Sequence, residues 1–509
     1  MSEINTLHAL LAVGQDDAVA LGAPGRPTLT YAGLRAHTDA TIATLNGLGI
    51  GRNDRVAIVL PNGPLMASAF VSIGAGASTA PLNPNYREPE FEFYLTDLNA
   101  KALVVEEGST SPAVTVAQTL NIPVLEAVAT ADAPAGQFEL RPRAAMNATA
   151  TANGGYAQPD DVALVLHTSG TTSRPKIVPL SHRNVCASAR NVGGSLALTA
   201  ADRCLNVMPL FHIHGLIAAV LSTLRAGASV ICTPGFDALQ FYGWLDAEKP
   251  TWYTAVPTMH QAILARASRN AEIIANTNLR FIRSSSASLP KPVMQELEET
   301  FRAPVIEAYG MTEAAHQMTC NPLPPRARKP GTVGVQAGPN VSIMDEQGNF
   351  LPANTTGEVV IQGPNVTLGY ENNPKANAEN FTNGWFRTGD QGVMDAEGYL
   401  TITGRLKEII NRGGEKISPR EVDDVLMEHP AVQQVVTFAM PHAKLGEEVA
   451  AAVVLRDGME VSERDLRSFV GERLADFKTP RKILFLSEIP KGATGKLQRI
   501  GLAEKLGLG

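Results

Sequence analysis

Short apolar runs of strand length alternate with helical stretches in this chain, and this alternation constrains its fold more than any other feature. The run at 54–60 fits a buried strand, the stretch at 64–74 fits a helix, and the run at 102–105 fits another strand. The same rhythm resumes after residue 176, with a helix expected near 215–225. Strands separated by helices pair in parallel, because each crossover helix returns the chain to the same end of the sheet. We therefore predict an α/β fold with parallel-rich sheets.

Two later regions depart from this pattern. Between residues 330 and 403, short runs with glycine turns predict a small antiparallel β subdomain. From Arg405 onwards, a capping box at 418–421 predicts the first helix of a separate α+β unit. A chain of 509 residues exceeds what one hydrophobic core usually organises. We predict an N-terminal domain over residues 1–404 and a C-terminal domain over residues 405–509.

The composition narrows the class of protein. Hydrophobic residues make up 44% of the chain and charged residues 18%, which is ordinary for a globular protein. A net charge of −7 argues against broad nucleic-acid binding, and no apolar run or signal region indicates a membrane or secreted protein. Four cysteines far apart in sequence favour buried free thiols. We expect a cytoplasmic protein without nucleic-acid or membrane partners, and nothing in the sequence indicates an oligomeric state.

The segment 167–176 has the composition of a phosphate-binding loop. It follows the apolar run 162–166 and contains small hydroxyl side chains, one glycine, one proline and two cations. Such a loop can direct backbone N–H groups, hydroxyl donors and positive charge at one point, which suits a polyphosphate. A solvated Ser/Thr turn is equally compatible with the segment. Its spacing differs from GxxxxGK[ST], which argues against a Walker-type NTPase.

Four further segments carry groups suited to a nucleotide. At 309–313 an acid beside a hydroxyl follows a predicted strand, a suitable place for magnesium on phosphate. At 385–390 a carboxylate at a tight turn could accept both hydroxyls of a ribose. The segment 404–408 places charged residues at the predicted domain boundary. The segment 490–497 contains lysine residues flanked by glycine. Singly, each is also compatible with an acidic turn, a charged linker or a solvated lysine.

Together, and in this order along almost the whole chain, these segments resemble the acyl-activating (adenylate-forming) enzyme superfamily. The resemblance implies ATP, Mg²⁺ and coenzyme A as cofactors or co-substrates. It also implies that Asp390 and Arg405 clamp the ribose, that Glu313 contacts the metal, and that Thr312 and Glu313 take part in catalysis. The ATP-binding residues that it implies are Thr168, Ser169, Gly170, Thr171, Thr172, Lys176, Tyr309, Thr312, Asp390 and Arg405.

The resemblance assigns further roles to the C-terminal part of the chain. It makes the C-terminal domain mobile, with Lys407 at the hinge and Lys496 as the catalytic lysine of the adenylation step. Rotation about the hinge would bring a glycine-containing segment to the site for the second step, where glycines let a pantetheine arm pass close to the backbone. The coenzyme A residues implied in that segment are Gly413, Gly414 and Lys416.

The loop itself departs from the family at two positions. Most relatives carry glycine where this sequence has Ser173 and Ile177. Isoleucine does not readily adopt a positive φ, so we expect extended or helical backbone where the chain leaves the loop.

The family lines its acid pocket from three places, and in this chain those places are polar. Relatives that act on fatty or aromatic acids tend to have glycine and alanine around 285–287 and an apolar residue or proline at 316. This sequence has Ser285, Ser286 and His316 there, with His214 expected across the pocket. Buried polar groups without partners cost about 1–3 kcal/mol each, so this lining suits a second carboxylate better than an alkyl chain. Either histidine is also compatible with a hydrogen-bonded core position.

These pocket features, with the segment 251–258, resemble the oxalyl-CoA synthetases of plants and fungi. We therefore expect an ATP-dependent, AMP-forming acid–CoA ligase that converts oxalate to oxalyl-CoA. One alternative is a ligase for medium-chain fatty acids or for aromatic, coumarate-like acids. Another is a non-catalytic nucleotide-binding protein on the same scaffold. Glu313, Asp390, Arg405 and Lys496 occurring together argue against the second alternative.

Overall fold

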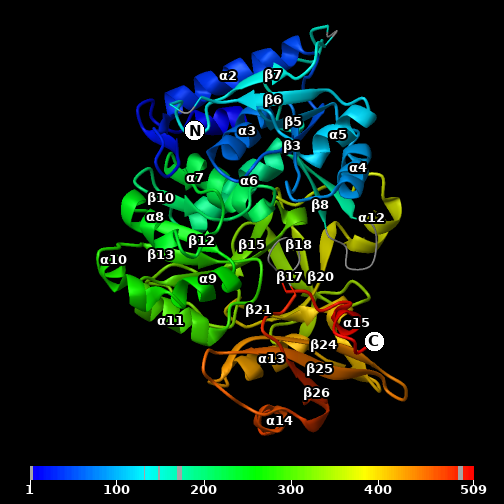
Figure 1. The fold of residues 1–509 in the computed structure, drawn as a ribbon. Helices are drawn as coiled ribbons and strands as arrows, with labels where there is room; N and C mark the ends of the chain where they lie inside the picture. Colours follow the sequence, from blue (N-terminus) through cyan, green and yellow to red (C-terminus); the bar gives the residue numbers. More distant parts are fainter. Residues whose placement is uncertain (1–3, 131, 147–148, 169–174, 491–496) are drawn as a thin grey trace.

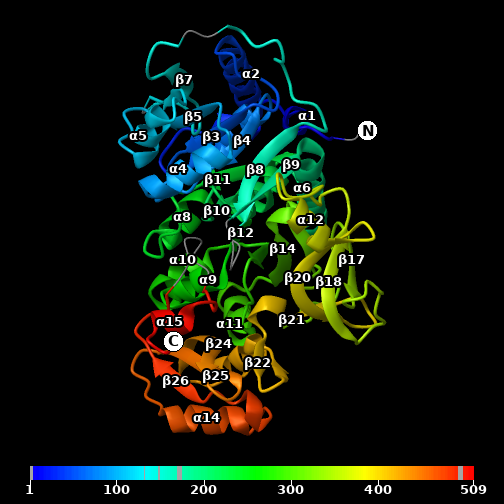
Figure 2. The same cartoon turned by 90° about the vertical axis from the view of Figure 1, so that its right-hand side faces the viewer.

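The computed structural model describes residues 4–130, 132–146, 149–168, 175–490 and 497–509, and within these ranges the chain forms four sheets. Two large α/β sheets lie one below the other in Figures 1 and 2, and the C-terminal sheet lies at the opposite end of the molecule from the N-terminus. A smaller sheet lies beside the second large one. The predicted α/β class, with a small β subdomain and an α+β C-terminal unit, is confirmed.

The first large sheet is parallel in its centre and antiparallel at both edges. Thr168 pairs with Lys176 where its two last strands join, so the predicted phosphate loop closes a hairpin. Ile177 lies in the second of these strands, which confirms the expected extended backbone. In spatial order the strands are β7 (Glu139–Pro142), β6 (Val124–Val128), β5 (Ala102–Glu106), β3 (Arg55–Val59), β4 (Ser78–Pro81), β8 (Val162–Thr168) and β9 (Lys176–Ser181).

The second large sheet holds the candidate acid-binding residues. Its central strands are parallel, so their carboxyl ends share one edge, where ligands of open α/β sheets usually bind. In spatial order the strands are β16 (Val335–Gln336), β15 (His316–Cys320), β14 (Val305–Met311), β13 (Phe281–Ser284), β12 (Trp252–Ala255), β10 (Arg203–Asn206), β11 (Ser229–Cys232), β1 (Val19–Gly22) and β2 (Leu29–Thr30).

Helices pack on the faces of both sheets, as Figure 1 shows. The predicted helix near 215–225 is α-helical only in its last turn, because residues 214–221 form a fully buried π-helical segment. The helices are α1 (Leu7–Leu11), α2 (Tyr31–Gly47), α3 (Pro64–Gly74), α4 (Glu88–Asp97), α5 (Pro112–Thr119), α6 (His182–Ser195), α7 (Ser222–Arg225), α8 (Phe241–Glu248), α9 (Pro257–Leu264), α10 (Ala271–Ala275) and α11 (Lys291–Phe301).

Burial on both faces explains the apolar runs of the central strands. Every residue of β12 and β13 is buried. Trp252 and Phe281 pack into one hydrophobic cluster, while Tyr253 and Ile282 pack into another on the opposite face. Strands covered on both faces read as continuous apolar runs. A charged residue inside such a strand, Arg283, is therefore exceptional.

The small sheet and the C-terminal sheet follow in sequence. The small sheet is antiparallel, as predicted for residues 330–403. Its strands are β17 (Asn340–Met344), β18 (Thr356–Gln362), β19 (Phe381–Thr382), β20 (Trp385–Met394) and β21 (Leu400–Arg405), with helix α12 (Pro374–Asn380). The C-terminal elements are β22 (Ile410–Arg412), β23 (Glu415–Ile417), α13 (Pro419–Met427), β24 (Val432–His442), β25 (Gly446–Leu455), α14 (Glu463–Gly471), β26 (Lys482–Phe485) and α15 (Leu502–Lys505).

The predicted capping box of α13 is half correct. The Ser418 side chain accepts a hydrogen bond from the Glu421 N–H and also donates to the carbonyl of Thr403 in β21. The Glu421 carboxylate, however, accepts two hydrogen bonds from Lys478 Nζ, at 2.7 and 2.8 Å. An ammonium group therefore takes the carboxylate that a full capping box would turn back to the N-cap backbone.

All four cysteines are buried and unpaired, which confirms the predicted free thiols. Burial raises the pKa of Cys186 and of Cys232 to about 12, and that of Cys320 to about 11. Within the described ranges, helices long and apolar enough to cross a membrane are absent.

Candidate active site

The two ends of the predicted phosphate loop lie side by side, while its central residues, Ser169, Gly170, Thr171 and Thr172, lie outside the described residues. Thr168 and Lys176 pair across the β8–β9 hairpin. Lys176 Nζ lies 4.4 Å from the centroid of the Tyr370 ring, a cation–π contact that fixes the ammonium at the base of the loop.

Tyr370 also joins the loop to the predicted metal ligand. Its hydroxyl donates to Glu313 Oε1 at 2.7 Å, so one aromatic ring contacts both Lys176 and Glu313. Burial raises the pKa of Glu313, while the Tyr370 hydrogen bond and the charges of Arg405 and Lys176 act against that rise. Thr312, the predicted phosphate contact, precedes Glu313 in a short 3₁₀ turn directly after β14.

The donor set at Glu313 fits magnesium better than a transition metal. Within the described part of the chain, no group of three or more His, Cys, Asp or Glu side chains could hold a metal ion. Mg²⁺ is usually bound by one or two carboxylates together with substrate phosphates, not by an all-protein cage. The single carboxylate of Glu313 beside the predicted phosphate loop fits that requirement.

The residues predicted to bind the ribose lie together. Asp390 Oδ2 accepts a hydrogen bond from the Tyr309 hydroxyl, and Asp390 Oδ1 accepts one from Arg405 Nε at 2.9 Å. Asp390 and Arg405 are paired across β20 and β21. The carboxylate of Asp390 raises the pKa of Arg405, because it stabilises the guanidinium charge. Tyr309, Asp390 and Arg405 thus form one hydrogen-bonded unit.

Both predicted acid-binding histidines contact the guanidinium of Arg283, a residue that was not predicted. Arg283 Nη1 donates to His214 Nε2 at 3.3 Å, and Arg283 Nη2 donates to His316 Nε2 at 3.0 Å. The two imidazoles are stacked, with ring centroids 5.1 Å apart. Thr254 and Gln317 complete the set of acceptors, at 3.4 and 3.3 Å from the guanidinium. Each of these five side chains is buried.

The hydrogen bonds from Arg283 fix the protons of both histidines. A guanidinium can only donate, so the Nε2 atoms of His214 and His316 must accept. Each imidazole is then neutral, with its proton on Nδ1. In His214 this Nδ1–H lies 3.0 Å from Ser286 Oγ and donates to it. Ser286 itself adopts a left-handed φ of 74°, which turns the chain at the end of β13.

Ser285 links this cluster to the ribose clamp. Its hydroxyl donates to the carbonyl of Ala308 at 2.8 Å, so only the lone pairs of Ser285 Oγ are left for a ligand. Ala308 precedes Tyr309, which binds Asp390. Strand β14 therefore connects the histidine cluster to the residues predicted to bind the ribose.

The predicted C-terminal site residues that the structure describes lie in the turn at 406–408 and in the β22–β23 hairpin. Lys407 is exposed in the turn 406–408, between β21 and β22. Gly413 and Gly414 form the turn between β22 and β23 with positive φ values of 60° and 100°, and Lys416 is exposed. The hydrogen bond of Gly413 N–H goes to Leu445 in the same C-terminal unit. Lys496 lies outside the described residues.

Arg499 anchors the stretch that follows Lys496. It donates to Asp423 Oδ2 at 2.6 Å and to the carbonyl of Thr437 at 2.8 Å, and it lies 3.3 Å from Glu408. Glu408 is the neighbour of Lys407, so the end of the chain is tied to the predicted hinge.

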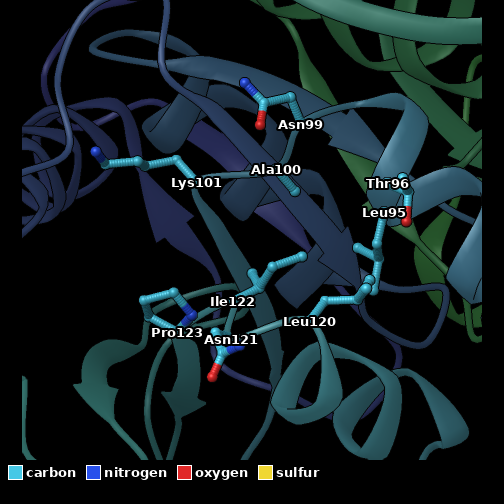
Figure 3. Close-up of a pocket in the computed structure, with 9 residues that line it drawn as sticks. All are labelled: Leu95, Thr96, Asn99, Ala100, Lys101, Leu120, Asn121, Ile122 and Pro123. Atoms are coloured by element: carbon cyan, nitrogen blue, oxygen red, sulfur yellow. The ribbon is translucent and has the colours of Figure 1, made fainter.

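A surface pocket elsewhere contains none of the predicted site residues (Figure 3). It lies between the end of α4 and the turn before β6, on the outer side of the first large sheet. Its lining residues are Leu95, Thr96, Asn99, Ala100, Lys101, Leu120, Asn121, Ile122 and Pro123.

The sequence contained a signal for one of the residues that were missed. Arg283 is a charged residue directly after Phe281 and Ile282 in a strand that is otherwise apolar, and such a position requires a special partner. Tyr370 gave no comparable signal, because an aromatic residue in a loop has no preferred partner in sequence.

Comparisons with known proteins agree over nearly the whole chain. A family model described as AMP-binding enzyme matches residues 11–371, and one described as AMP-binding enzyme C-terminal domain matches residues 421–496. An oxalate–CoA ligase of Arabidopsis thaliana is 45% identical over 95% of this chain and 94% of its own length. An oxalate–CoA ligase of Saccharomyces cerevisiae is 45% identical over 89% of this chain and 87% of its own length.

A solved structure shares the complete fold. ATP-bound MatB from Rhodopseudomonas palustris superimposes with a TM-score of 0.87 at 29% sequence identity, covering 98% of each chain. The likeness therefore includes the C-terminal part as well as the two large sheets.

Proposed function

The chain belongs to the AMP-binding enzyme family, and we propose that it is an AMP-forming ligase that uses ATP to join oxalate to coenzyme A. The resemblance to oxalyl-CoA synthetases of plants and fungi that the sequence predicted is confirmed by the plant and yeast relatives. One observation carries the choice of acid: the pocket side chains His214, Arg283 and His316 are buried, polar and hydrogen-bonded to one another.

In the first half-reaction, an oxalate oxygen attacks the α-phosphorus of ATP, and the bond to pyrophosphate breaks. Two anions must approach each other, so cations and hydrogen-bond donors are needed to offset their repulsion. We assign the phosphates to Thr168, Lys176, Thr312 and the residues of the loop between β8 and β9. Ribose binding falls to Asp390, which already accepts hydrogen bonds from Tyr309 and Arg405.

Two further groups complete the adenylation site in this proposal. Glu313 would hold Mg²⁺, which supplies charge neutralisation to the leaving pyrophosphate when it is bound. Lys496 would donate positive charge to the reacting phosphate, as its family position implies.

The pocket chemistry selects a small acid with a second carboxylate. A hydrocarbon chain would supply neither a counter-ion for the buried charge of Arg283 nor an acceptor for its unpartnered Nε, and an unpaired buried polar group costs about 1–3 kcal/mol. A second carboxylate supplies acceptors for N–H and O–H donors and a negative charge for the guanidinium. Oxalate is the smallest dicarboxylate and brings both carboxylates within one short molecule.

In the second half-reaction, the thiolate of coenzyme A attacks the carbonyl carbon of the oxalyl-adenylate. The bond to AMP breaks, and the thioester is formed. We propose that the C-terminal domain, residues 405–509, rotates about Lys407 against the N-terminal domain, residues 1–404, between the two steps. Gly413, Gly414 and Lys416 then take their place beside the pantetheine arm.

We propose that the protein is cytoplasmic. Four buried free thiols are typical of a reducing compartment, which supports the cytoplasm.

A panel of acids tests the function. Pyrophosphate release should be fastest with oxalate, slower with malonate and weak with octanoate or coumarate, and mass spectrometry should identify oxalyl-CoA as the product. Activity with octanoate or coumarate but not with oxalate would favour the alternative ligase. ATP binding without pyrophosphate release from any acid would favour the non-catalytic alternative.

A further inference from the structure

Arg283 is a buried charge with no acidic partner. Its relative exposure is 0%, and its hydrogen bonds go to His214, His316, Thr254 and Gln317, which are all uncharged acceptors. Among the described residues, no ion pair to a carboxylate involves this guanidinium. Its Nε atom is also buried without a hydrogen-bond partner.

Such a charge needs a reason, because burying an ion without a counter-ion is costly. Burial lowers the pKa of Arg283 to about 10, so the side chain still carries its charge at neutral pH. Arg280, directly before the same strand, shows the ordinary solution: it pairs with the buried carboxylate of Asp202 at 2.9 Å. The chain therefore has an arginine with a protein counter-ion and an arginine without one within four positions.

We propose that the missing counter-ion of Arg283 is the distal carboxylate of the substrate, which makes Arg283 the residue that selects a dianionic acid. The inference rests on the proposed function and deepens it by naming the group that reads the second charge. Arg283 acts as a positioning residue, because its Nη1 and Nη2 groups donate to the two imidazoles and their neighbours.

Hydrogen bonds through the imidazoles connect the Arg283 charge to donors that the acid can bind. Since each Nε2 accepts from Arg283, each Nδ1 carries a proton and each ring is polarised as a donor. The Nδ1–H of His214 donates to Ser286 Oγ, which leaves the Ser286 hydroxyl hydrogen to be donated onward to an acceptor such as a carboxylate oxygen. A hydrocarbon tail has no acceptors and could not bind donors arranged in this way.

A matched pair of substitutions tests the proposal. R283Q removes the charge without a protein counter-ion, R283K keeps a charge but loses the planar fork, and R280Q removes the paired charge nearby. Steady-state kinetics give the KM for oxalate, the KM for ATP and kcat for each full-length variant, and thermal melts with and without oxalate plus a non-hydrolysable ATP analogue give the Tm.

We expect R283Q to raise the KM for oxalate by about 100-fold and R283K by about 10-fold, with kcat and the KM for ATP nearly unchanged. R283Q should also lose the rise in Tm that oxalate causes. R280Q should keep both oxalate properties but lose more Tm than R283Q, because it strips Asp202 of its partner.

Three outcomes would contradict the proposal. One is an unchanged oxalate KM in R283Q. Another is an equal rise in the KM for oxalate and for ATP, which would indicate general damage to the fold. The last is a larger loss of Tm in R283Q than in R280Q, since Arg283 would then be structural. Absence of oxalate turnover in the wild-type enzyme would instead refute the proposed function itself.

Discussion

At the scale of single residues, His316 shows how much the backbone contributes to the pocket. Its φ of 103° lies in the left-handed region, which favours glycine. A Cβ on Gly310 would lie 1.8 Å from the carbonyl oxygen of His316, so the neighbouring strand needs glycine at position 310. The imidazole is therefore held by a strained residue and a close backbone contact, not by its hydrogen bond to Arg283 alone.

We expect H316V to weaken oxalate use far more than ATP binding. Valine removes the imidazole and, being β-branched, resists a positive φ, so it should also lower the stability by about 1 kcal/mol or more. H316N is the matched control, because asparagine tolerates this backbone while lacking the ring. Both variants should raise the KM for oxalate about 10- to 100-fold in a pyrophosphate-release assay. Equal losses of oxalate and ATP binding would argue against a substrate contact.

We expect K496A to separate the two half-reactions. Adenylate formation should fall by about 10²–10³ or more, since a group that stabilises charge in the transition state is lost. Thioester formation from preformed oxalyl-adenylate should stay largely intact, because the family position of Lys496 serves only the first step. Isotope exchange between pyrophosphate and ATP measures the first step, and oxalyl-CoA formation from the adenylate measures the second. Survival of both steps would show that Lys496 has another role.

Residues in the pocket could be predicted only where a family position named them. His214, Ser286 and His316 are brought together as expected, although they come from three separated segments. Arg283 was not predicted, because the family resemblance points to the serines that follow it in the same segment. Tyr370 lies 57 positions after Glu313 in the sequence, and only the folded chain brings its hydroxyl to that carboxylate.

At the scale of elements, the start of α13 combines two contacts in one hydroxyl. Ser418 caps the helix and also binds the carbonyl of Thr403 in β21. The helix is thereby attached to the strand that ends at Arg405, directly before the predicted hinge.

We expect S418A to lower the free energy of unfolding by about 1 kcal/mol, the usual cost of losing an N-cap. The loss should appear in urea unfolding followed by circular dichroism. S462A, at the N-cap of α14, is the control, because that serine caps a helix without binding a strand near the hinge. A change in the rate of the second half-reaction in S418A, but not in S462A, is the further result that the Thr403 contact predicts.

The limits of prediction differ between elements. α3 was predicted from its pattern, because its bounds coincide with the predicted helix at 64–74. The π-helical segment at 214–221 could not be predicted, since a segment buried on every side carries no periodicity that separates one helix type from another. The reciprocal half of the α13 capping box failed because Lys478 lies far away in sequence.

At the scale of the whole molecule, Glu307 interacts electrostatically with residues of the C-terminal unit. It lies in β14, is 1% exposed, and accepts a hydrogen bond from the Leu289 N–H at 3.2 Å. Burial raises the pKa of Glu307 to about 7, with Arg420 of α13 acting against the rise and Asp424 adding to it. Contacts of this kind between distant segments are not visible in a sequence.

We expect Glu307 to make the folded chain less stable as the pH rises. An unfolded glutamate loses its proton near the ordinary glutamate pKa of 4.5, while the folded one keeps it to a pKa of about 7. Between these values the folded state binds more protons, so stability falls across this window by up to about 3 kcal/mol. E307Q should remove this dependence, measured as the difference in unfolding free energy between about pH 5 and about pH 8. The exposed Glu299 provides the control, and E299Q should behave like the wild type.

The buried cysteines have a practical consequence for observing the enzyme at work. Maleimide dyes react with thiolates, and all four native thiols are enclosed with raised pKa values, so they should stay unlabelled. New cysteines at Leu239 and Met459, which are 76% and 43% exposed in the two parts of the chain, would then carry a fluorophore pair on an otherwise native background. Energy transfer between the dyes would then test the proposed rotation of the C-terminal domain during each turnover, one molecule at a time.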